Sequence, residues 1–199
     1  MTLIIVTILF SYVLGSLSFA VIVSRAMGLP DPRSFGSKNP GATNMLRGGN
    51  KLAALLVLFG DALKGWLAVW LTNHVVSPHH LNALEDIAAL AVFIGHGYPI
   101  FFGFKGGKGV ATALGILLAL NPLLGALTFL SWLFMIIFSR ISSLSALTAL
   151  VVAPVLSLWL SPASVQRWTV FVLAVLLLAH HHSNIRKLLS GKETVFKKP

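Results

Sequence analysis

The chain contains no cysteine among its 199 residues, which excludes disulfides, zinc thiolate sites and thiol nucleophiles. Charged residues are also scarce, because Asp, Glu, Lys and Arg together make up 10% of the chain, whereas about 25% is usual in a soluble domain. Hydrophobic residues account for 56%, and the mean hydropathy is +0.87. Apolar runs of membrane-spanning length recur throughout, so we expect an integral membrane protein with a single domain over residues 1–199.

Acidic residues are the rarer charged class, with 5 Asp and Glu against 15 Lys and Arg, which gives a net charge of +10. The basic residues are not clustered on a soluble module, so we expect no nucleic-acid partner. They lie in short loops between apolar runs, where positive charge marks the cytoplasmic side. The first basic residue, Arg25, follows the first apolar run, which predicts a retained helix and not a cleaved signal peptide.

The lengths of the apolar runs predict spanning helices, each of which needs roughly 20 residues. The expected ranges are 2–24, 52–74, 83–102, 110–120, 122–138, 144–160 and 166–182. Asn121-Pro122 divides the 110–138 run, because proline ends or kinks a helix, and without that break the count would be six. Seven spans with the N-terminus outside place 13 of the 15 Lys and Arg on the cytoplasmic side. The predicted fold class is therefore all-α, a polytopic membrane bundle of seven transmembrane helices with a cytoplasmic C-terminus.

The segment "GFKGGKGVATALG" places Lys105 and Lys108 among glycines, directly before an apolar helix that begins near Val110. Consecutive glycines allow backbone amides to approach an anion, and the start of a helix adds its positive dipole end. Lys108 is unfavourable at that end unless an anion lies close to it. No Ser or Thr follows Lys108, so this is not a nucleotide-binding Walker loop. The alternative is a tight turn flanked by lysines with a topological role.

Two other polar segments carry charge. The stretch "FGSKNPGATNMLRGGNK", residues 35–51, is rich in turn formers and hydrogen-bond donors. Its Arg47 could bind a phosphate through two N–H groups. The alternative is that the whole stretch is a solvated loop.

In "GDALKG", Asp61 and Lys64 are three residues apart on one helix face, within pairing distance. Charges within a span face the bundle interior or a functional cavity, so this pair is either structural or catalytic. His96 is expected to be a core histidine with a backbone partner.

Two C-terminal segments are polar as well. In "SRISS", Ser142 and Ser143 can cap the next helix or donate to phosphate oxygens, and capping is the default. In "HHHSNIRKLLSGKE", three consecutive histidines, residues 180–182, precede Asn184. Neighbouring helical side chains point about 100° apart, so these histidines make a poor metal site and no metal is expected. A general base or a phosphate donor is the better interpretation.

Taken together, the chain resembles the bacterial acyl-phosphate:glycerol-3-phosphate acyltransferase family, the PlsY family. The matching stretches are "GSKNPGATNMLR", "GDALKG", "GHGYPIFFGFKGGKGVATALG", "RISSLSAL" and "NIRKLLSGKE", in the family's order. The resemblance implies transfer of a fatty acyl group from acyl phosphate, and not from acyl-CoA, to the 1-hydroxyl of sn-glycerol 3-phosphate. The implied products are lysophosphatidic acid and inorganic phosphate, in the first step of phospholipid biosynthesis. It also implies an enzyme of the bacterial inner membrane with a cytoplasmic active site, no cofactor and no need of protein partners.

The resemblance also assigns site residues, motif by motif. Those expected to be catalytic are His181, Asn184, Lys108 and Ser37, and those expected to bind substrate are Arg47, Asn39, Asn44, Lys105, Gly106, Gly107, Gly109, Ser142 and Ser143. The chain has "HHSNI" where the family tends to have "HRENI". His181 is therefore the family histidine by its spacing from Asn184, with His180 and His182 as alternatives.

An acyl phosphate is an activated mixed anhydride, so the enzyme needs position and charge and no covalent nucleophile. In this hypothesis Gly106 to Gly109 hold the acyl phosphate, and Arg47, a lysine and a serine bind glycerol 3-phosphate. The base is His181 or the substrate's own phosphate, and the residues leave this open.

Three other functions are weighed against this one. An acyl-CoA-dependent acyltransferase would carry a His and an Asp separated by four residues, and none of the seven histidines is followed by Asp at that spacing. An anion transporter would need a second polar gate in the outer connections, which are short. A non-catalytic lipid scaffold would have little need for charge from four loops.

Overall fold

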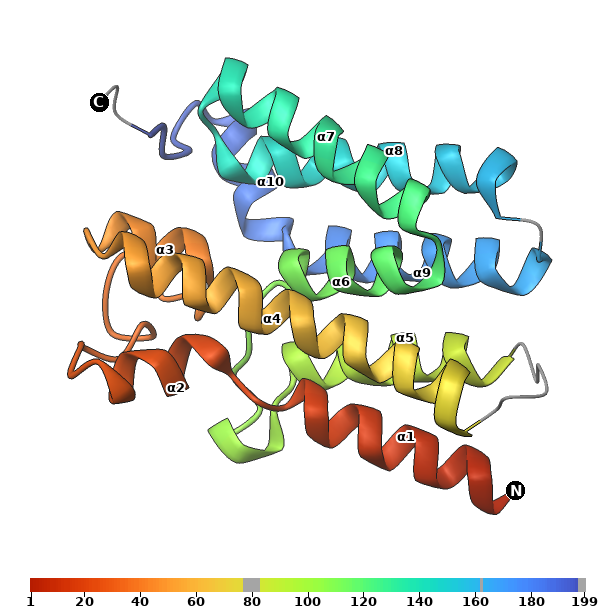
Figure 1. Ribbon diagram of the computed structural model, residues 1–199. Coiled ribbons are helices and arrows are strands. Elements are labelled where there is room, and N and C mark those ends of the chain that lie inside the picture. Colours follow the sequence, from red (N-terminus) through yellow and green to blue (C-terminus); the bar gives the residue numbers. More distant parts are fainter. Residues whose placement is uncertain (77–82, 162, 197–199) are drawn as a thin grey trace. The chain divides into compact units, whose positions relative to one another are not determined.

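The computed structural model describes residues 1–76, 83–161 and 163–196, and in these ranges all regular secondary structure is helical (Figure 1). The chain forms two compact units, Met1–Leu120 and Asn121–Pro199. Within the described ranges, four helices are long and apolar enough to cross a membrane, and two bent helix pairs raise that number to six. The predicted multi-pass, all-helical membrane protein is thereby confirmed. Residues 77–82, in the connection between the expected helices 52–74 and 83–102, and Lys197 and Lys198 of the tail lie outside the described residues.

In the first unit, α4 is the central helix, packed against α6, α5, α2 and α3, while α1 packs along α5. Glycines permit this close contact, because a Cβ on Gly65 would collide with the α6 backbone and one on Gly115 with the α4 backbone. Gly15 and Gly95 have the same role between α1 and α5. The elements are α1 (Thr2–Gly15), α2 (Phe19–Ala26), α3 (Ala42–Arg47), α4 (Lys51–Leu71), the π-helical η1 (Thr72–Val76), α5 (Ala83–Gly97), the 3-10 helix η2 (Ile100–Phe102) and α6 (Val110–Leu120).

The prediction of a continuous helix over 2–24 is wrong. The chain breaks at residues 16–18 into α1 and α2, which are bent by 43°. Ser18 has an extended backbone at the start of α2, and the freed carbonyl of Leu17 accepts a hydrogen bond from Lys64 Nζ of α4 at 2.7 Å. A backbone group freed at membrane depth needs such a partner, so a lysine distant in the sequence stabilises the break. The helix expected over 83–102 also ends early, at Gly97, two residues before Pro99.

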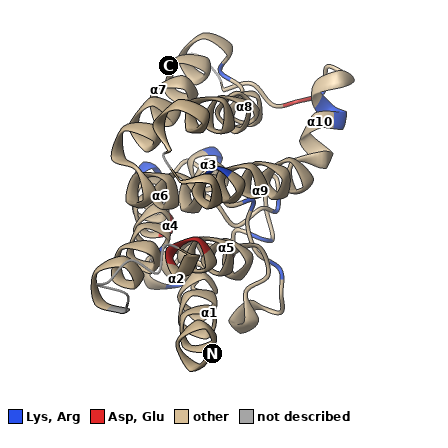
Figure 2. Ribbon diagram, turned by 90° about the vertical axis from the view of Figure 1, so that its right-hand side faces the viewer, with Lys and Arg blue, Asp and Glu red and all other residues tan. Residues whose placement is uncertain are grey.

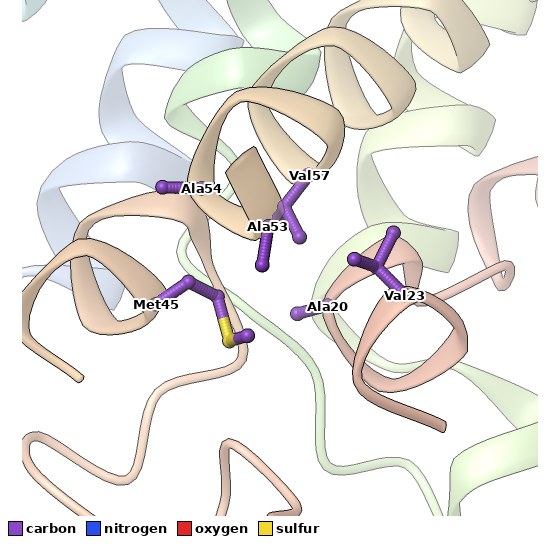
Figure 3. Packing of buried hydrophobic residues seen from close by; sticks show 6 residues of the cluster. All are labelled: Ala20, Val23, Met45, Ala53, Ala54 and Val57. Atoms are coloured by element: carbon purple, nitrogen blue, oxygen red, sulfur yellow. The ribbon is translucent and has the colours of Figure 1, made fainter. Parts of the chain in front are cut away.

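The segment 35–51, predicted as turn-rich, contains the short helix α3. Met45 of α3 packs with Ala20 and Val23 of α2 and with Ala53 and Val57 of α4, as Figure 3 shows. Close packing of side chains is the main force that stabilises contacts between helices in a membrane. This cluster fixes α3, and with it Arg47 in its last turn, against the helices of the first unit.

The second unit comprises α7 (Pro122–Ser139), α8 (Ser142–Leu160), α9 (Ser164–His180) and α10 (His182–Leu189), with α8 packed on α7 and α9. The predicted break at Asn121-Pro122 is confirmed. Asn121 Oδ1 accepts the amides of Leu123 and Leu124, both at 3.0 Å, and Pro122 occupies the first turn of α7. Figure 2 shows that Lys and Arg lie mainly in the connections and at α3 and α10, leaving the long helices largely uncharged.

Candidate active site

The glycine loop, residues 105–109, connects η2 to α6 and is tied to the end of α5. The amide of Gly106 donates to the Gly97 carbonyl at 3.1 Å, and that of Gly107 donates to the His96 carbonyl at 3.2 Å. A Cβ on Gly106 would collide with the His96 carbonyl, so the close approach of two backbones requires glycine here. These two amides hold the loop itself, and their direct binding of a phosphate stays a prediction.

The end of the loop adjoins the helix that was predicted to present its positive end. Gly109 has a φ of +90°, which favours glycine, and α6 begins at the next residue. The first turn of any helix leaves backbone amides without partners inside the helix, and an anion is favourable there. Lys108 is half-buried beside this turn, whereas Lys105 is exposed. Gly109 and the first turn of α6 are therefore the parts of this loop best suited to an anion.

A buried ion pair lies beneath the loop. Lys64 Nζ is 2.8 Å from Asp61 Oδ1, and these residues are 1% and 3% exposed. The predicted pairing within one helix turn is thus confirmed. His96 Nδ1 lies 3.5 Å from the same carboxylate oxygen and 3.1 Å from Thr112 Oγ1, two side-chain contacts that the sequence did not reveal. Asp61 of α4 therefore contacts the last turn of α5, and His96 of that turn contacts the first turn of α6.

Replacing Lys64 alone by methionine should destabilise the protein strongly. The change leaves the Asp61 carboxylate buried without its counter-ion and the Leu17 carbonyl without its donor. Loss of one partner of a buried pair costs about 3–5 kcal/mol. We expect this loss in the free energy of unfolding in detergent micelles, and we expect the double variant Asp61→Asn/Lys64→Met to recover most of it. Lys51→Met, at the exposed start of the same helix, is the control. If Lys64→Met and Lys51→Met lower the free energy of unfolding equally, the buried ion pair does not stabilise the fold.

The loop before α3 is organised by Asn44. Its Oδ1 accepts the amide of Ser37 at 2.9 Å, and its Nδ2 donates to the carbonyls of Pro32 at 2.8 Å and Phe35 at 3.2 Å. The Asn44 side chain is buried and holds the loop in place, so its direct binding of substrate stays a prediction. Ser37 is exposed at the surface of this loop.

This loop lies beside the glycine loop. The Pro40 carbonyl is 3.0 Å from the position that a Cβ on Gly107 would take, which places residues 35–51 next to residues 105–109. Two segments predicted as parts of one site are therefore neighbours in the first unit. Asn39 is half-buried in this loop, and Arg47, also half-buried, ends the helix that follows it.

Asp31 and Arg33, just before this loop, form an ion pair that was not predicted from the sequence, and Arg33 also contacts η2. Arg33 contacts the Asp31 carboxylate at 2.7 Å, donates to the Phe102 carbonyl at 3.3 Å and lies 6.0 Å from the centre of the Phe102 ring. The hydrogen bond from Arg33 lowers the pKa of Asp31, so this carboxyl is ionised at neutral pH. The spacing of the two residues in "DPR" was the available signal, because a side chain two residues on can reach back to a turn-forming Asp.

In the second unit, the structure distinguishes the three consecutive histidines. His181, at the junction of α9 and α10, is 2% exposed, and its Nδ1 lies 2.8 Å from the Leu177 carbonyl. A carbonyl only accepts, so Nδ1 carries a proton, and Nε2 has the lone pair when the ring is neutral. His182 is exposed and His180 is half-buried. The catalytic role assigned to His181 from its spacing stays a prediction.

Other predicted residues of the second unit gather at the same end of it. Asn184 Nδ2 donates to Glu193 Oε2 at 2.9 Å, and the amide of Phe196 donates to the Arg140 carbonyl at 2.9 Å, in the turn between α7 and α8. The predicted capping by Ser142 and Ser143 is wrong, because Ile141 is the N-cap residue and both serines lie in the first turn of α8. The Ser143 hydroxyl is buried without a hydrogen-bond partner among the described residues. Within residues 1–76, 83–161 and 163–196, no group of three or more acidic or histidine side chains could hold a metal ion.

Apolar spanning helices, with a buried ion pair within one of them and polar loops at their ends, define a multi-pass integral membrane protein. The family model described as glycerol-3-phosphate acyltransferase matches residues 5–191. The chain belongs to this family.

Named relatives extend over most of the chain. It is 57% identical over 185 residues to a glycerol-3-phosphate acyltransferase of Paraburkholderia phymatum, covering 92% of this chain and 88% of that protein. It is 56% identical over 186 residues to one of Burkholderia thailandensis, covering 92% and 91%. Among solved structures it is similar to PlsY (YgiH), an integral membrane glycerol 3-phosphate acyltransferase, in its glycerol 3-phosphate form, with a TM-score of 0.91, 35% identity and coverage of 98% and 96%. The lysophosphatidic acid form of PlsY gives a TM-score of 0.89 at 34% identity, with coverage of 98% and 95%.

Proposed function

We propose that this protein transfers a fatty acyl group from acyl phosphate to the 1-hydroxyl of glycerol 3-phosphate. Membership of the glycerol-3-phosphate acyltransferase family supports the reaction class and the acceptor. Structural similarity to PlsY, solved in glycerol 3-phosphate and lysophosphatidic acid forms, supports this acceptor and this product. The observation that carries the proposal is the anchored glycine loop, which places Lys108 and Gly109 beside the first turn of α6.

The proposed reaction makes one bond and breaks one bond at the acyl carbon. The hydroxyl oxygen of glycerol 3-phosphate bonds to that carbon, and the carbon–oxygen bond to the phosphate breaks. The phosphate leaves with the bonding electrons, and the hydroxyl proton passes to a base. Such a donor needs no enzyme nucleophile, because phosphate is already a good leaving group, so catalysis consists of positioning and charge stabilisation.

Each loop has a proposed role. Lys108, Gly109 and the first turn of α6 bind the acyl-phosphate group, because cations and orphan amides both favour an anion. Arg47 binds the phosphate of glycerol 3-phosphate, with Ser37, Asn39 and Lys105 as further contacts. From the second unit we assign donor roles to Ser142 and Ser143. We assign the orientation of the attacking hydroxyl to His181 and Asn184, and His181 Nε2 or the substrate phosphate accepts the proton.

We further propose that the chain, as one acyltransferase domain, crosses the membrane seven times. Six spans follow from the four long helices and the two bent pairs, and the short apolar helix α6 supplies the seventh. With the N-terminus outside, this count puts the glycine loop, the α7–α8 turn and the C-terminus on the cytoplasmic side, in accord with their basic residues. The compartment we propose is the bacterial cytoplasmic membrane.

The test uses the purified protein in detergent with radiolabelled glycerol 3-phosphate and palmitoyl phosphate. We expect radiolabelled lysophosphatidic acid, with one inorganic phosphate released for each molecule formed. Release of phosphate without any lysophosphatidic acid would show hydrolysis in place of transfer and would overturn the proposal.

The change Arg47→Lys should weaken the binding of glycerol 3-phosphate. Lysine keeps the charge but lacks the two parallel N–H groups that fit a phosphate. We expect the KM for glycerol 3-phosphate to rise about tenfold while kcat changes by less than about twofold, the pattern of lost substrate binding. Arg25→Lys, at the exposed end of α2, is the control and should leave both constants unchanged. If KM in the Arg47 variant stays at the wild-type value, Arg47 is not a ligand of this substrate.

A further inference from the structure

The buried groups beneath the glycine loop form one continuous set of contacts. Lys64 joins the α1–α2 break to Asp61, with its Nζ 2.7 Å from the Leu17 carbonyl and 2.8 Å from the carboxylate. Asp61 then faces His96, and His96 faces Thr112 in the first turn of α6. Asp61, Lys64, His96 and Thr112 are all at most 7% exposed, and we call these four residues the buried network.

His96 connects this network to the glycine loop in two ways. Its carbonyl accepts the amide of Gly107, and its ring Nε2 lies against Gly107, where a Cβ would collide with it. Its ring Nδ1 faces Asp61 and Thr112, so Nε2 is the ring nitrogen that faces the loop. Thr112 belongs to the first turn of α6, which begins at Val110 directly after Gly109. A shift of His96 or Thr112 therefore moves the backbone that carries Lys108 and Gly109.

We propose that the buried network is a positioning device that holds the glycine loop and the start of α6 in the geometry for phosphate binding. None of its side chains is assigned contact with substrate. A charged network suits this task better than apolar packing, because directional hydrogen bonds fix angles as well as distances. The expected effect of the buried network on kcat/KM rests on the proposed function, whereas its effect on the mobility of the glycine loop does not.

The test begins with Thr112→Val, which keeps the shape of the side chain and removes the hydroxyl that faces His96. We expect kcat/KM for palmitoyl phosphate to fall roughly tenfold, since small displacements of a binding group carry large kinetic costs. Thr112→Ser restores the hydroxyl and should return kcat/KM to within about twofold of wild type. Thr7→Val, at another buried threonine in α1, is the control and should leave kcat/KM unchanged.

Amide hydrogen exchange provides a readout independent of activity. In Thr112→Val we expect peptides covering residues 105–111 to exchange about tenfold faster, while peptides from α1 and α9 exchange at the wild-type rate. If Thr112→Val does not fold, His96→Gln gives the same comparison. Unchanged loop exchange with unchanged kcat/KM overturns the proposal, and so does a uniform rise in exchange over the whole chain, which would indicate a purely structural role. A wild-type protein that makes no lysophosphatidic acid would refute the proposed function and leave the exchange result to decide on the network.

Discussion

Replacing Lys108 by alanine should lower kcat/KM for palmitoyl phosphate by roughly 100-fold or more, the scale of losing one charge-stabilising group in an active site. Lys108 lies half-buried just before α6, whose first-turn amides favour an anion. In the proposed site, alanine removes both the attraction to the phosphate and the charge that stabilises the leaving group. The measurement is steady-state kinetics with purified protein in detergent, with the melting temperature as a check on folding.

Two matched variants make this result specific. Lys51→Ala removes a lysine from the exposed start of α4 and should leave kcat/KM unchanged, which excludes a general effect of net charge. Lys108→Arg keeps the charge and should retain part of the activity. Turnover of the alanine variant at the wild-type level would remove Lys108 from the phosphate site.

The second large effect is expected for Gly106→Ala. The added Cβ would collide with the carbonyl of His96, and the second nearest atom is the carbonyl oxygen of Gly97, which accepts the Gly106 amide. Neither is the end of a flexible side chain, so the loop backbone must move. A displacement of about 1 Å costs roughly 100-fold in rate, and we expect kcat/KM to fall by at least that factor.

The control for this prediction is Gly103→Ala in the adjoining turn. Gly103 has a φ of +65°, so alanine there is strained by about 1–2 kcal/mol, but its Cβ would meet nothing within 4 Å. It should lower the melting temperature slightly and keep most of the activity. Equal losses in both variants would mean that backbone strain, and not the contact with α5, explains the effect of Gly106→Ala.

Features that depend on local chemistry could be predicted from the sequence. Asn121-Pro122 ends one helix and begins the next because the Asn side chain caps the first turn and Pro needs no amide partner there. Asp61 and Lys64 pair because three residues bring two side chains to one helix face. The order of the polar motifs identified the family, which the comparisons confirmed.

Features that depend on distant contacts could not be predicted. The break between α1 and α2 contains no proline, and it is stabilised by a lysine 47 positions after Leu17. The amides of Gly106 and Gly107 looked available for phosphate, but the end of α5 accepts their hydrogen bonds. The capping prediction for Ser142 and Ser143 was wrong because the chain begins α8 one residue earlier than a serine cap requires. In the first two cases the deciding partner is set by packing, which no short segment encodes.

The choice of acyl donor tests the central claim most directly. Purified protein is incubated with radiolabelled glycerol 3-phosphate and either palmitoyl phosphate or palmitoyl-CoA, and lysophosphatidic acid is quantified for each donor. An anchored glycine loop that binds a phosphate next to the acyl carbon predicts product from palmitoyl phosphate and none from the CoA ester. Product from palmitoyl-CoA alone, or from neither donor, would contradict this account.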